Sequence, residues 1–375
     1  MAQSYDVIVA GMGAMGSAAS FHLTRGGSKV LGIDRFVPPH NAGSSHGQTR
    51  IIREAYFEHP SYVPLIQRAY TLWETLASES ERQLLLYTGG LMIGRDGSTV
   101  ISGALESAKA HELPHKLMTA DDVRDRYPIF HPDDDMQAVW EPRAGVLFPE
   151  ACVEAHLTLA RQSGATLNSG ETILRWKPEG SGVRVTTDKG EYLAGQLLIT
   201  AGSWFKNLLP DLDLPFQVER QVQYWFEAKY PDLFAPEDCP IQIWEYEPGK
   251  FFYAFPDLGH GVKIALHHEG EITDADTVRR TIDATETETM RKLLLRYLPT
   301  ADGTLLTATA CVYTNSPDGH FLIDRHPAHS QVLIASPCSG HGFKFSSVIG
   351  EVLADLATKG ESCQDLNLFR WRKWS

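Results

Sequence analysis

Three glycines near the N-terminus have the spacing of a phosphate-binding turn. The GxGxxG motif consists of Gly11, Met12, Gly13, Ala14, Met15 and Gly16. Glycines let the backbone approach a pyrophosphate closely, and a helix that starts at the turn offers unpaired N–H groups to negative charge. Asp34 follows 18 residues after Gly16, close to the spacing of an acid that accepts hydrogen bonds from a ribose. The motif predicts a dinucleotide site and leaves open whether the ligand is NAD or FAD.

The segments around this turn have the patterns that such a site requires. Residues 5–10 read YDVIVA, an apolar run typical of a buried parallel strand. Residues 17–25 have a helical pattern that Gly26 and Gly27 end, and residues 29–33 form a second short strand that leads into Asp34. This order of strand, turn, helix and strand predicts a dinucleotide-binding fold.

Two later segments also place turns after strands. Residues 197–204 read LLITAGSW, a strand that runs into a small-residue turn. Residues 331–335 are a predicted strand, residues 339–343 read SGHGF, and residues 346–356 have the apolar spacing of a helix. A glycine-rich turn between a strand and a helix can aim backbone N–H groups at an anion. We therefore expect a second phosphate or carboxylate contact near the C-terminal turn.

Length and charge limit the possible partners. A chain of 375 residues with 43% hydrophobic residues is long enough for two domains with separate cores. It has 34 Lys and Arg against 47 Asp and Glu, and its net charge of -13 opposes binding to nucleic acid or to an anionic membrane surface. We expect small molecules as its partners.

The cysteines and the N-terminus indicate a compartment. The five cysteines are Cys152, Cys239, Cys311, Cys338 and Cys363, an odd and scattered set without CxxC spacing. Such a set argues against a disulfide framework or a zinc site, so we expect no metal. No signal-peptide pattern and no apolar run of about 20 residues is present. These features predict a protein of the reducing cytoplasm.

Five separate motifs follow one another along the chain. They are GSSHGQTRIIR at 43–53, YAFP at 253–256, KIALH at 263–267, ACVYT at 310–314 and SGHGFKFSS at 339–347. In these motifs the sequence resembles the monomeric sarcosine oxidase and N-methyltryptophan oxidase family. This family belongs to the FAD-dependent amine oxidases, which include pipecolate and fructosyl amino acid oxidases. The resemblance runs essentially end to end, and it implies FAD as the dinucleotide.

The resemblance also implies the architecture. We expect an α/β (α+β) fold, in which an antiparallel-sheet substrate domain is inserted into a Rossmann-like FAD-binding domain. The FAD domain would comprise residues 1–84, 150–216 and 312–375, and the substrate domain residues 85–149 and 217–311. Residues 218–226 and 241–255 are rich in aromatic and β-branched residues, as strands are, and residues 285–297 have helical spacing.

The cofactor contacts are carried over from the family. Cys311 matches the cysteine that holds FAD as an 8α-thioether, whereas Cys338, where the family usually has an apolar residue, is expected to line the flavin site without bonding. The other cofactor contacts implied are Gly11, Gly13, Ala14, Met15, Gly16, Asp34, Arg35, Ser44, His46, Thr49, Arg50, Ala201, Gly202, Trp204, Gly340, Gly342, Phe343 and Lys344. The family's usual HisHisGlyAsp reads here as Ser45, His46, Gly47 and Gln48, a departure that affects the tuning of the flavin.

The resemblance assigns catalytic roles to a second set of residues. Arg53 and Lys344 match the two cations that hold the substrate carboxylate, a suitable task for a guanidinium fork and a compact ammonium. His46 and Arg50 match residues against the flavin ring. The residues that match polar groups of the substrate pocket are Tyr253, His267 and Tyr313. Lys263 matches the lysine that lies, through a water, over flavin N5 and promotes reaction with oxygen. Without the resemblance, Lys263 would be interpreted as a strand lysine whose stem packs on apolar surface while its ammonium reaches solvent.

These assignments predict oxidation of a secondary amine, with sarcosine as the first choice. The reaction would give an amino acid, formaldehyde and hydrogen peroxide, with oxygen as acceptor and the enzyme as a monomer. N-methyltryptophan or a cyclic imino acid such as pipecolate stays open as substrate, because substrate size would be set by loops such as residues 242–250. Two other classes also stay open: an FAD dehydrogenase with another electron acceptor, and a non-catalytic NAD-binding sensor.

Overall fold

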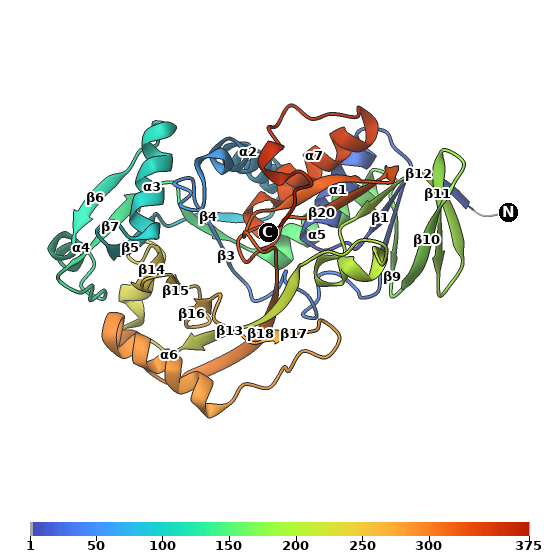
Figure 1. The fold of residues 1–375 in the computed structure, drawn as a ribbon. Helices are drawn as coiled ribbons and strands as arrows, with labels where there is room; N and C mark the ends of the chain where they lie inside the picture. The colour runs from blue at the N-terminus through green and yellow to red at the C-terminus, as the bar shows by residue number, and fades with distance from the viewer. Residues whose placement is uncertain (1–2, 375) are drawn as a thin grey trace.

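Two large sheets and one small sheet organise the chain (Figure 1). The computed structural model describes residues 3–374. In Figure 1 the strands β10 and β11 lie at one end of the molecule, and β6, β7 and α4 lie at the other. The glycine-rich turn and the predicted substrate residues lie between these ends, where the two large sheets meet the small one.

The first sheet has a parallel centre. β1 (Gln3–Ala10) pairs in parallel with β2 (Val30–Asp34) and with β12 (Glu191–Ile199). The other strands of this sheet are β9 (Thr166–Ser169), β10 (Ile173–Glu179), β11 (Gly182–Thr187), β19 (Leu322–His326) and β20 (His329–Ser336). β2 is buried throughout, and β1 is buried from Val7 to Ala10, as expected for parallel strands covered on both faces. The predicted strand, turn, helix and strand at the N-terminus are confirmed.

Helices cover this sheet and pack on one another. They are α1 (Ala14–Arg25), α2 (Val63–Ser80), α5 (Pro149–Gln162) and α7 (Ser346–Thr358). α1 contacts both α5 and α7. A Cβ at Gly350 would come within 2.5 Å of Ala18, so this glycine lets α7 cross α1 at close range. The predicted C-terminal strand and helix are thus confirmed as β20 and α7.

The second sheet is mainly antiparallel. Its order is β17-β13-β16-β15-β14-β5-β7-β6, and β18 pairs with β13. Its strands are β5 (Gly90–Arg95), β6 (Lys116–Thr119), β7 (Met136–Glu141), β13 (Gln217–Phe226), β14 (Ile241–Glu247), β15 (Lys250–Asp257), β16 (Val262–His267), β17 (Ile272–Thr273) and β18 (Leu305–Asn315). The helices α3 (Thr99–Ala110), α4 (Ala120–Arg126) and α6 (Ala284–Tyr297) accompany it. The predicted mixed architecture is therefore confirmed.

One segment differs from its expected form. Residues 241–255 were predicted as strand, which β14 and β15 confirm, whereas residues 242–250 were also named as a loop that sets substrate size. That loop is wrong as far as Glu247, because β14 pairs with β5 and β15. Only a short turn separates β14 from β15. The first five residues of β14 are buried between two neighbouring strands, so the side chains of this segment have fixed directions.

The small sheet joins the two predicted domains. It consists of β3 (Arg50–Ile52), β8 (Gly145–Leu147) and β4 (Leu85–Tyr87), in that order across the middle strand. β3 lies in the interval assigned to the FAD domain, whereas β4 and β8 lie in residues 85–149. β18 also continues three residues beyond the boundary at 312. The exact division into domains stays a prediction.

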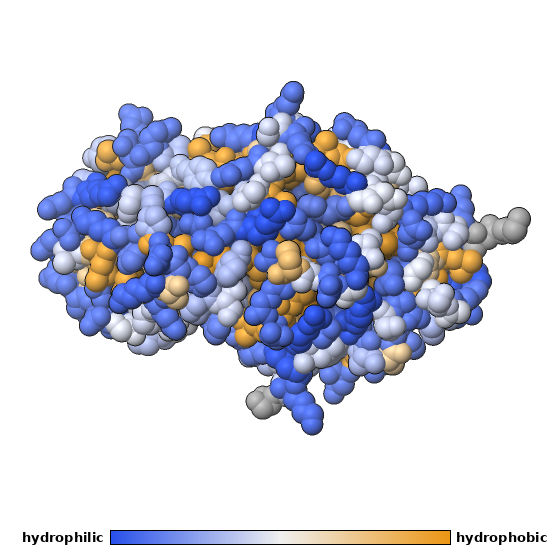
Figure 2. Space-filling view, turned by 90° about the horizontal axis from the view of Figure 1, so that it is seen from above, coloured by the Kyte–Doolittle hydropathy of each residue, from blue (hydrophilic) through white to orange (hydrophobic). Residues whose placement is uncertain are grey.

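Hydrophilic and hydrophobic residues both occur on the surface. In Figure 2, hydrophobic residues form separate patches among hydrophilic ones on the face shown. Within residues 3–374, no helix is long and apolar enough to cross a membrane.

Candidate active site

A large cavity opens where the first sheet meets the second. It is lined by the β1–α1 turn, the segment that follows β2, the end of β12, strands β15, β16 and β18, and the turn at residues 337–344. The cavity encloses about 310 Å³. Segments far apart in the sequence thus contribute to one site, and most of the predicted residues are among them.

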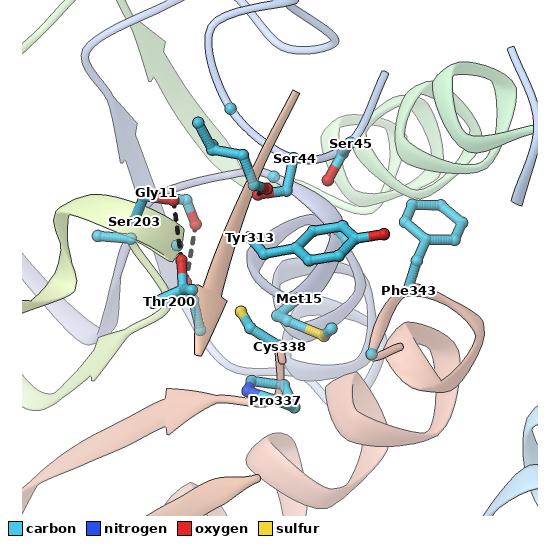
Figure 3. A pocket seen from close by; sticks show the side chains of 18 of the residues that line it. Gly11, Met15, Ser44, Ser45, Thr200, Ser203, Tyr313, Pro337, Cys338 and Phe343 are labelled. Carbon is cyan, nitrogen blue, oxygen red and sulfur yellow. Dashed lines mark hydrogen bonds between the residues drawn. The ribbon is translucent and has the colours of Figure 1, made fainter. Parts of the chain in front are cut away.

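The glycine turn has the close contacts of a dinucleotide-binding loop. Gly11 has φ +93°, and a Cβ there would lie 2.7 Å from Ala201 Cα. A Cβ at Gly16 would lie 1.8 Å from the Gly11 carbonyl oxygen. The hydroxyl of Thr200 donates to that same carbonyl at 2.8 Å, as Figure 3 shows. Gly13 is the N-cap of α1 and supplies no side-chain cap, so the first turn of the helix presents its amides to the cavity.

Asp34 and Arg35 define one end of the cavity. Asp34 is buried, and its two oxygens accept from the amides of Met12 at 2.7 Å and Phe36 at 2.8 Å. Burial raises the pKa of this carboxyl, whereas the two amides oppose that shift. Arg35 pairs with Asp276 at 2.7 Å, and its guanidinium lies over the Trp204 ring. Asp276 also accepts from Trp204 Nε1 at 2.8 Å, so these side chains form a polar cover at this end.

Cys311 and Arg50 lie together beside this cavity. Cys311 is buried on β18, with Sγ 3.8 Å from the Ser44 carbonyl and 3.7 Å from an Arg50 Nη2 donor. Arg50 Nη2 also donates to the Ser44 carbonyl at 2.6 Å, and the Ser44 hydroxyl donates to the Val312 carbonyl at 2.7 Å. Arg50 therefore places a positively charged donor directly beside the Cys311 sulfur.

Cys338 has a different setting. It lines the cavity, and Figure 3 shows it beside Met15 and Pro337, across from the Tyr313 ring. Burial raises the pKa of the Cys338 thiol to about 11. A buried thiol with a raised pKa is a weak nucleophile near neutral pH.

Two buried cations, Arg53 and Lys344, line the cavity. The Arg53 guanidinium lies 4.2 Å from the ring centroids of both Tyr56 and Phe57. The Lys344 ammonium donates to the His341 carbonyl at 2.7 Å. Burial, with Arg53 nearby, lowers the pKa of Lys344 to about 7. Two cations held in an enclosed site are suited to a bound carboxylate.

Three polar side chains from three strands meet in the same cavity. His267 Nδ1 lies 3.1 Å from the Tyr313 hydroxyl, and the ring centroids of Tyr253 and His267 are 6.4 Å apart. Burial lowers the pKa of His267 well below its usual value, so the ring is neutral. His268, the neighbour that could have been confused with it, contacts Glu219 at 3.4 Å and does not line the cavity.

Comparisons with known proteins identify the group to which this chain belongs. Residues 6–356 match the family described as FAD dependent oxidoreductase. The monomeric sarcosine oxidase of Streptomyces avermitilis is 44% identical over 100% of this chain and 98% of its own length. The monomeric sarcosine oxidase of Bacillus sp. (strain NS-129) is 41% identical over 98% of this chain and 97% of its own length. The N-methyl-L-tryptophan oxidase of Yersinia pestis is 35% identical over 97% of this chain and 98% of its own length.

This chain is a member of the family of monomeric sarcosine oxidases and N-methyl-L-tryptophan oxidases. It is an FAD-dependent amine oxidase, and the predicted family and the predicted dependence on FAD are confirmed. Among solved structures, NikD, an amino acid oxidase, superposes with a TM-score of 0.84 at 24% identity and covers 98% of this chain and 97% of its own. Glycine oxidase from Geobacillus kaustophilus gives 0.84 at 17% identity, with all of both chains covered. At these identities the likeness shows the fold alone.

Most of the predicted site residues of this amine oxidase line the large cavity. They are Gly11, Gly13, Ala14, Met15, Asp34, Arg35, Ser44, Arg50, Arg53, Ala201, Gly202, Trp204, Tyr253, His267, Tyr313, Gly340, Gly342, Phe343 and Lys344. Within the described residues, the predicted ones outside this lining are Gly16, His46, Thr49, Lys263 and Cys311. Gly16 instead lies against Gly11, and Cys311 lies behind Ser44.

Lys263 of β16 contacts the loop that precedes β3 and Arg50. Its ammonium donates to the Gly47 carbonyl at 2.7 Å and to the carbonyl and hydroxyl of Thr49, both at 3.0 Å. Burial and the charge of Arg50 lower the pKa of Lys263 well below its usual value. Lys263 and Thr49 line a second, smaller cavity. His46, buried in the same loop, has a pKa lowered to about 3 by burial and by Arg50, so it is neutral.

The sequence interpretation missed two members of the site. Glu58 lines the cavity and pairs with Arg53, with Nη2 2.8 and 2.5 Å from its two oxygens. Although burial favours a neutral carboxyl, Arg53 outweighs it and lowers the pKa of Glu58. His341 also lines the cavity and lies with Nδ1 2.5 Å from the Tyr56 hydroxyl. Glu58 follows Arg53 by only five residues, and this short separation was the one feature of the sequence that could have predicted their pairing.

Proposed function

We propose that this amine oxidase oxidises the N-methyl group of sarcosine or of a closely related N-methyl amino acid. One molecule each of sarcosine, water and oxygen would give glycine, formaldehyde and hydrogen peroxide. The observation that carries the proposal is the placement of Arg53 and Lys344, two buried cations from opposite parts of the chain, in one cavity with His267 and Tyr313. Such a cavity can fix an amino acid by its carboxylate.

The chain's own residues would orient the substrate. Arg53 and Lys344 would take the carboxylate, and this contact holds the methyl group at one place and converts an encounter into an oriented step. Neutral His267, with Tyr313 and Tyr253 beside it, would offer hydrogen-bonding groups to the amine without adding positive charge. Bound FAD accepts the two electrons that leave the C–H bond.

We propose that FAD is attached covalently to Cys311. Support comes from the positively charged guanidinium of Arg50 at 3.7 Å from Cys311 Sγ, and from the raised pKa of the competing Cys338 thiol. The glycine turn with Asp34 would hold the pyrophosphate and ribose, and Arg35 and Trp204 would cover this end of the cofactor.

Oxygen is the proposed electron acceptor, and Lys263 is the proposed activator. Its ammonium is buried, and three loop oxygens accept from it. These acceptors oppose the effect of burial and of Arg50, which lower the pKa of Lys263. In its charged form the ammonium would stabilise the negative charge that develops on oxygen. We also propose a monomer, as the names of the sarcosine oxidase relatives suggest, and a reducing compartment, which the free cysteines fit.

A substrate panel tests the proposal. Sarcosine, N-methyltryptophan, pipecolate and proline would be compared by peroxide release in air. The expected result is the highest kcat/KM for sarcosine or another small N-methyl amino acid. Oxidation of N-methyltryptophan alone would instead assign the activity of the 35% identical relatives, and flavin reduction without peroxide would indicate a dehydrogenase.

A further inference from the structure

A buried carboxylate outside the cavity holds the backbone that carries Arg53. Glu141 is the last residue of β7 and is 1% exposed. It is not among the residues that line the large cavity in the described part of the chain. Its backbone pairs with Gly90 of β5, so the second sheet fixes its position. No step proposed above uses this side chain.

The Glu141 carboxylate accepts from the two amides that follow Arg53. Its Oε1 accepts from Glu54 N at 2.5 Å, and its Oε2 accepts from Ala55 N at 2.8 Å. The Ala55 carbonyl in turn accepts from Arg53 Nη1 at 2.9 Å. The Ala55 backbone is therefore fixed at two points: its N–H donates to Glu141, and its C=O accepts from the Arg53 guanidinium. The position of Ala55 in turn helps to determine the position of that guanidinium.

Burial and the neighbouring groups act in opposite directions on the ionisation of Glu141. Burial raises the pKa of Glu141 to about 7, and Glu54 adds to that shift, whereas the two amides and Arg53 favour the ionised form. The Glu54 side chain pairs instead with Arg143 at 3.1 Å. Loss of the Glu141 acceptors would leave two buried N–H groups without partners, which is costly.

We propose, on the basis of the function proposed above, that Glu141 is a positioning residue for the substrate carboxylate: it fixes the Glu54–Ala55 backbone and so sets the place of the Arg53 guanidinium. The guanidinium lies between two aromatic rings at 4.2 Å from each, so it has little freedom to correct for a displaced backbone. A displacement of about 1 Å in a positioning group can cost on the order of a hundredfold in rate.

The test compares a carboxylate substrate with its neutral amide. The ratio of kcat/KM for sarcosine to that for sarcosinamide is measured in the wild type and in Glu141→Gln. Gln keeps one acceptor oxygen but places an NH2 group against the other amide. We expect the ratio to fall about tenfold, because only the substrate with a carboxylate depends on the place of Arg53. The ratio is independent of the amount of folded enzyme, so a partly unfolded preparation does not imitate the effect.

Glu245→Gln is the matched control. Glu245 lies on β14 of the same sheet, is buried, and accepts from two backbone amides, Val100 N at 2.9 Å and Gly249 N at 3.1 Å. It is not a partner of Arg53. The same substitution there should leave the ratio at the wild-type value.

A second variant and a binding measurement complete the test. If Glu141→Gln does not fold, Glu141→Asp keeps the charge with a shorter reach and should also lower the ratio. Methoxyacetate has an ether oxygen in place of the amine and therefore serves as a carboxylate ligand that is not oxidised. Calorimetric titration should show that the Glu141 variants bind it more weakly than the wild type does, by a similar factor. A wild-type ratio in the Glu141 variants, or an equal fall in Glu245→Gln, would overturn the positioning role. A wild type that does not prefer sarcosine to its amide would instead overturn the proposed function.

Discussion

Arg53 is bonded to Glu58 in the same cavity that would receive a substrate carboxylate. Its Nη2 atom lies 2.8 and 2.5 Å from the two Glu58 oxygens, while Nη1 donates to the Ala55 carbonyl at 2.9 Å. The guanidinium is therefore already paired with one carboxylate. A second carboxylate at Arg53 must share it with Glu58 or displace it, so the charge of Glu58 opposes substrate binding.

Glu58→Gln should strengthen the binding of a carboxylate ligand. Gln keeps an oxygen that can accept from Arg53 but removes the negative charge that competes with the ligand. We expect the Kd for methoxyacetate to fall by about threefold to tenfold, which corresponds to roughly 1 kcal/mol. Titration calorimetry measures this Kd, with Glu58→Asp as the control that keeps the charge. Weaker binding in Glu58→Gln would show that Glu58 mainly orients Arg53.

Arg53→Met and Lys344→Met should each weaken use of the substrate. A charge-assisted hydrogen bond contributes on the order of 1.5 to 3 kcal/mol, so we expect kcat/KM to fall about tenfold to a hundredfold. Steady-state peroxide release measures the effect. Arg25, an exposed cation that pairs with Glu79 outside the cavity, provides the control Arg25→Met, which should keep the KM for sarcosine. Wild-type kcat/KM in both cavity variants would reject the two-cation carboxylate site.

Carboxylate binding should weaken as pH rises above about 7. Burial, with the charge of Arg53, lowers the pKa of Lys344 to about 7 in the ligand-free enzyme. Below this pH the ammonium is charged and attracts the carboxylate; above it the neutral amine does not, and binding must then take up a proton. The Kd for methoxyacetate should therefore increase by up to about tenfold per pH unit above 7. In Lys344→Met the same titration should be flat over this range, and an unchanged slope would assign the dependence to another group.

The sequence predicted those parts of the site that depend on local patterns. The turn at Gly11 to Gly16 is recognisable because its spacing follows from backbone contact with a pyrophosphate, and β1, α1 and β2 were predicted from periodicity. Arg53 and Lys344 were assigned through resemblance, since nothing in their local pattern distinguishes a buried cation from a solvated one. The structure places both in the cavity.

Contacts between segments that are distant in the chain could not be predicted from the sequence. Glu141 lies 86 residues from Ala55, and only the fold brings its carboxylate to that amide. Residues 241–255 were predicted as strand from their aromatic and β-branched residues, but residues 242–250 were also counted among the loops that set substrate size; the pairing of β14 with β5 and β15 shows which neighbours it has. Pairing of this kind depends on tertiary context, which overrides local propensity.

Cys311→Ala should release the flavin from covalent attachment. The thiol of Cys311 lies beside Arg50, whereas the pKa of Cys338 is raised to about 11, so only Cys311 is expected to react with the flavin. Acid-precipitated wild type and Cys338→Ser should stay yellow, and acid-precipitated Cys311→Ala should be colourless. Mass spectrometry of the flavin peptide identifies the residue directly. A flavin on the peptide that contains Cys338 would contradict the assignment.

Lys263→Met should slow the reaction of the reduced enzyme with oxygen far more than it slows reduction by the amine. The buried Lys263 ammonium donates to the loop at Gly47 and Thr49. This loop leads into Arg50, which lines the large cavity. A buried cation stabilises the negative charge that appears as the first electron reaches oxygen, and loss of one such donor costs about a hundredfold or more. Anaerobic mixing with sarcosine times the first half-reaction, and mixing of the reduced enzyme with oxygenated buffer times the second. Thr49→Val is the matched control, because it removes only the hydroxyl that accepts from Lys263 at 3.0 Å and leaves the charge in place. Reoxidation of Lys263→Met at the wild-type rate would leave Lys263 with a purely structural role, that of tying the loop to β16, and would favour an acceptor other than oxygen.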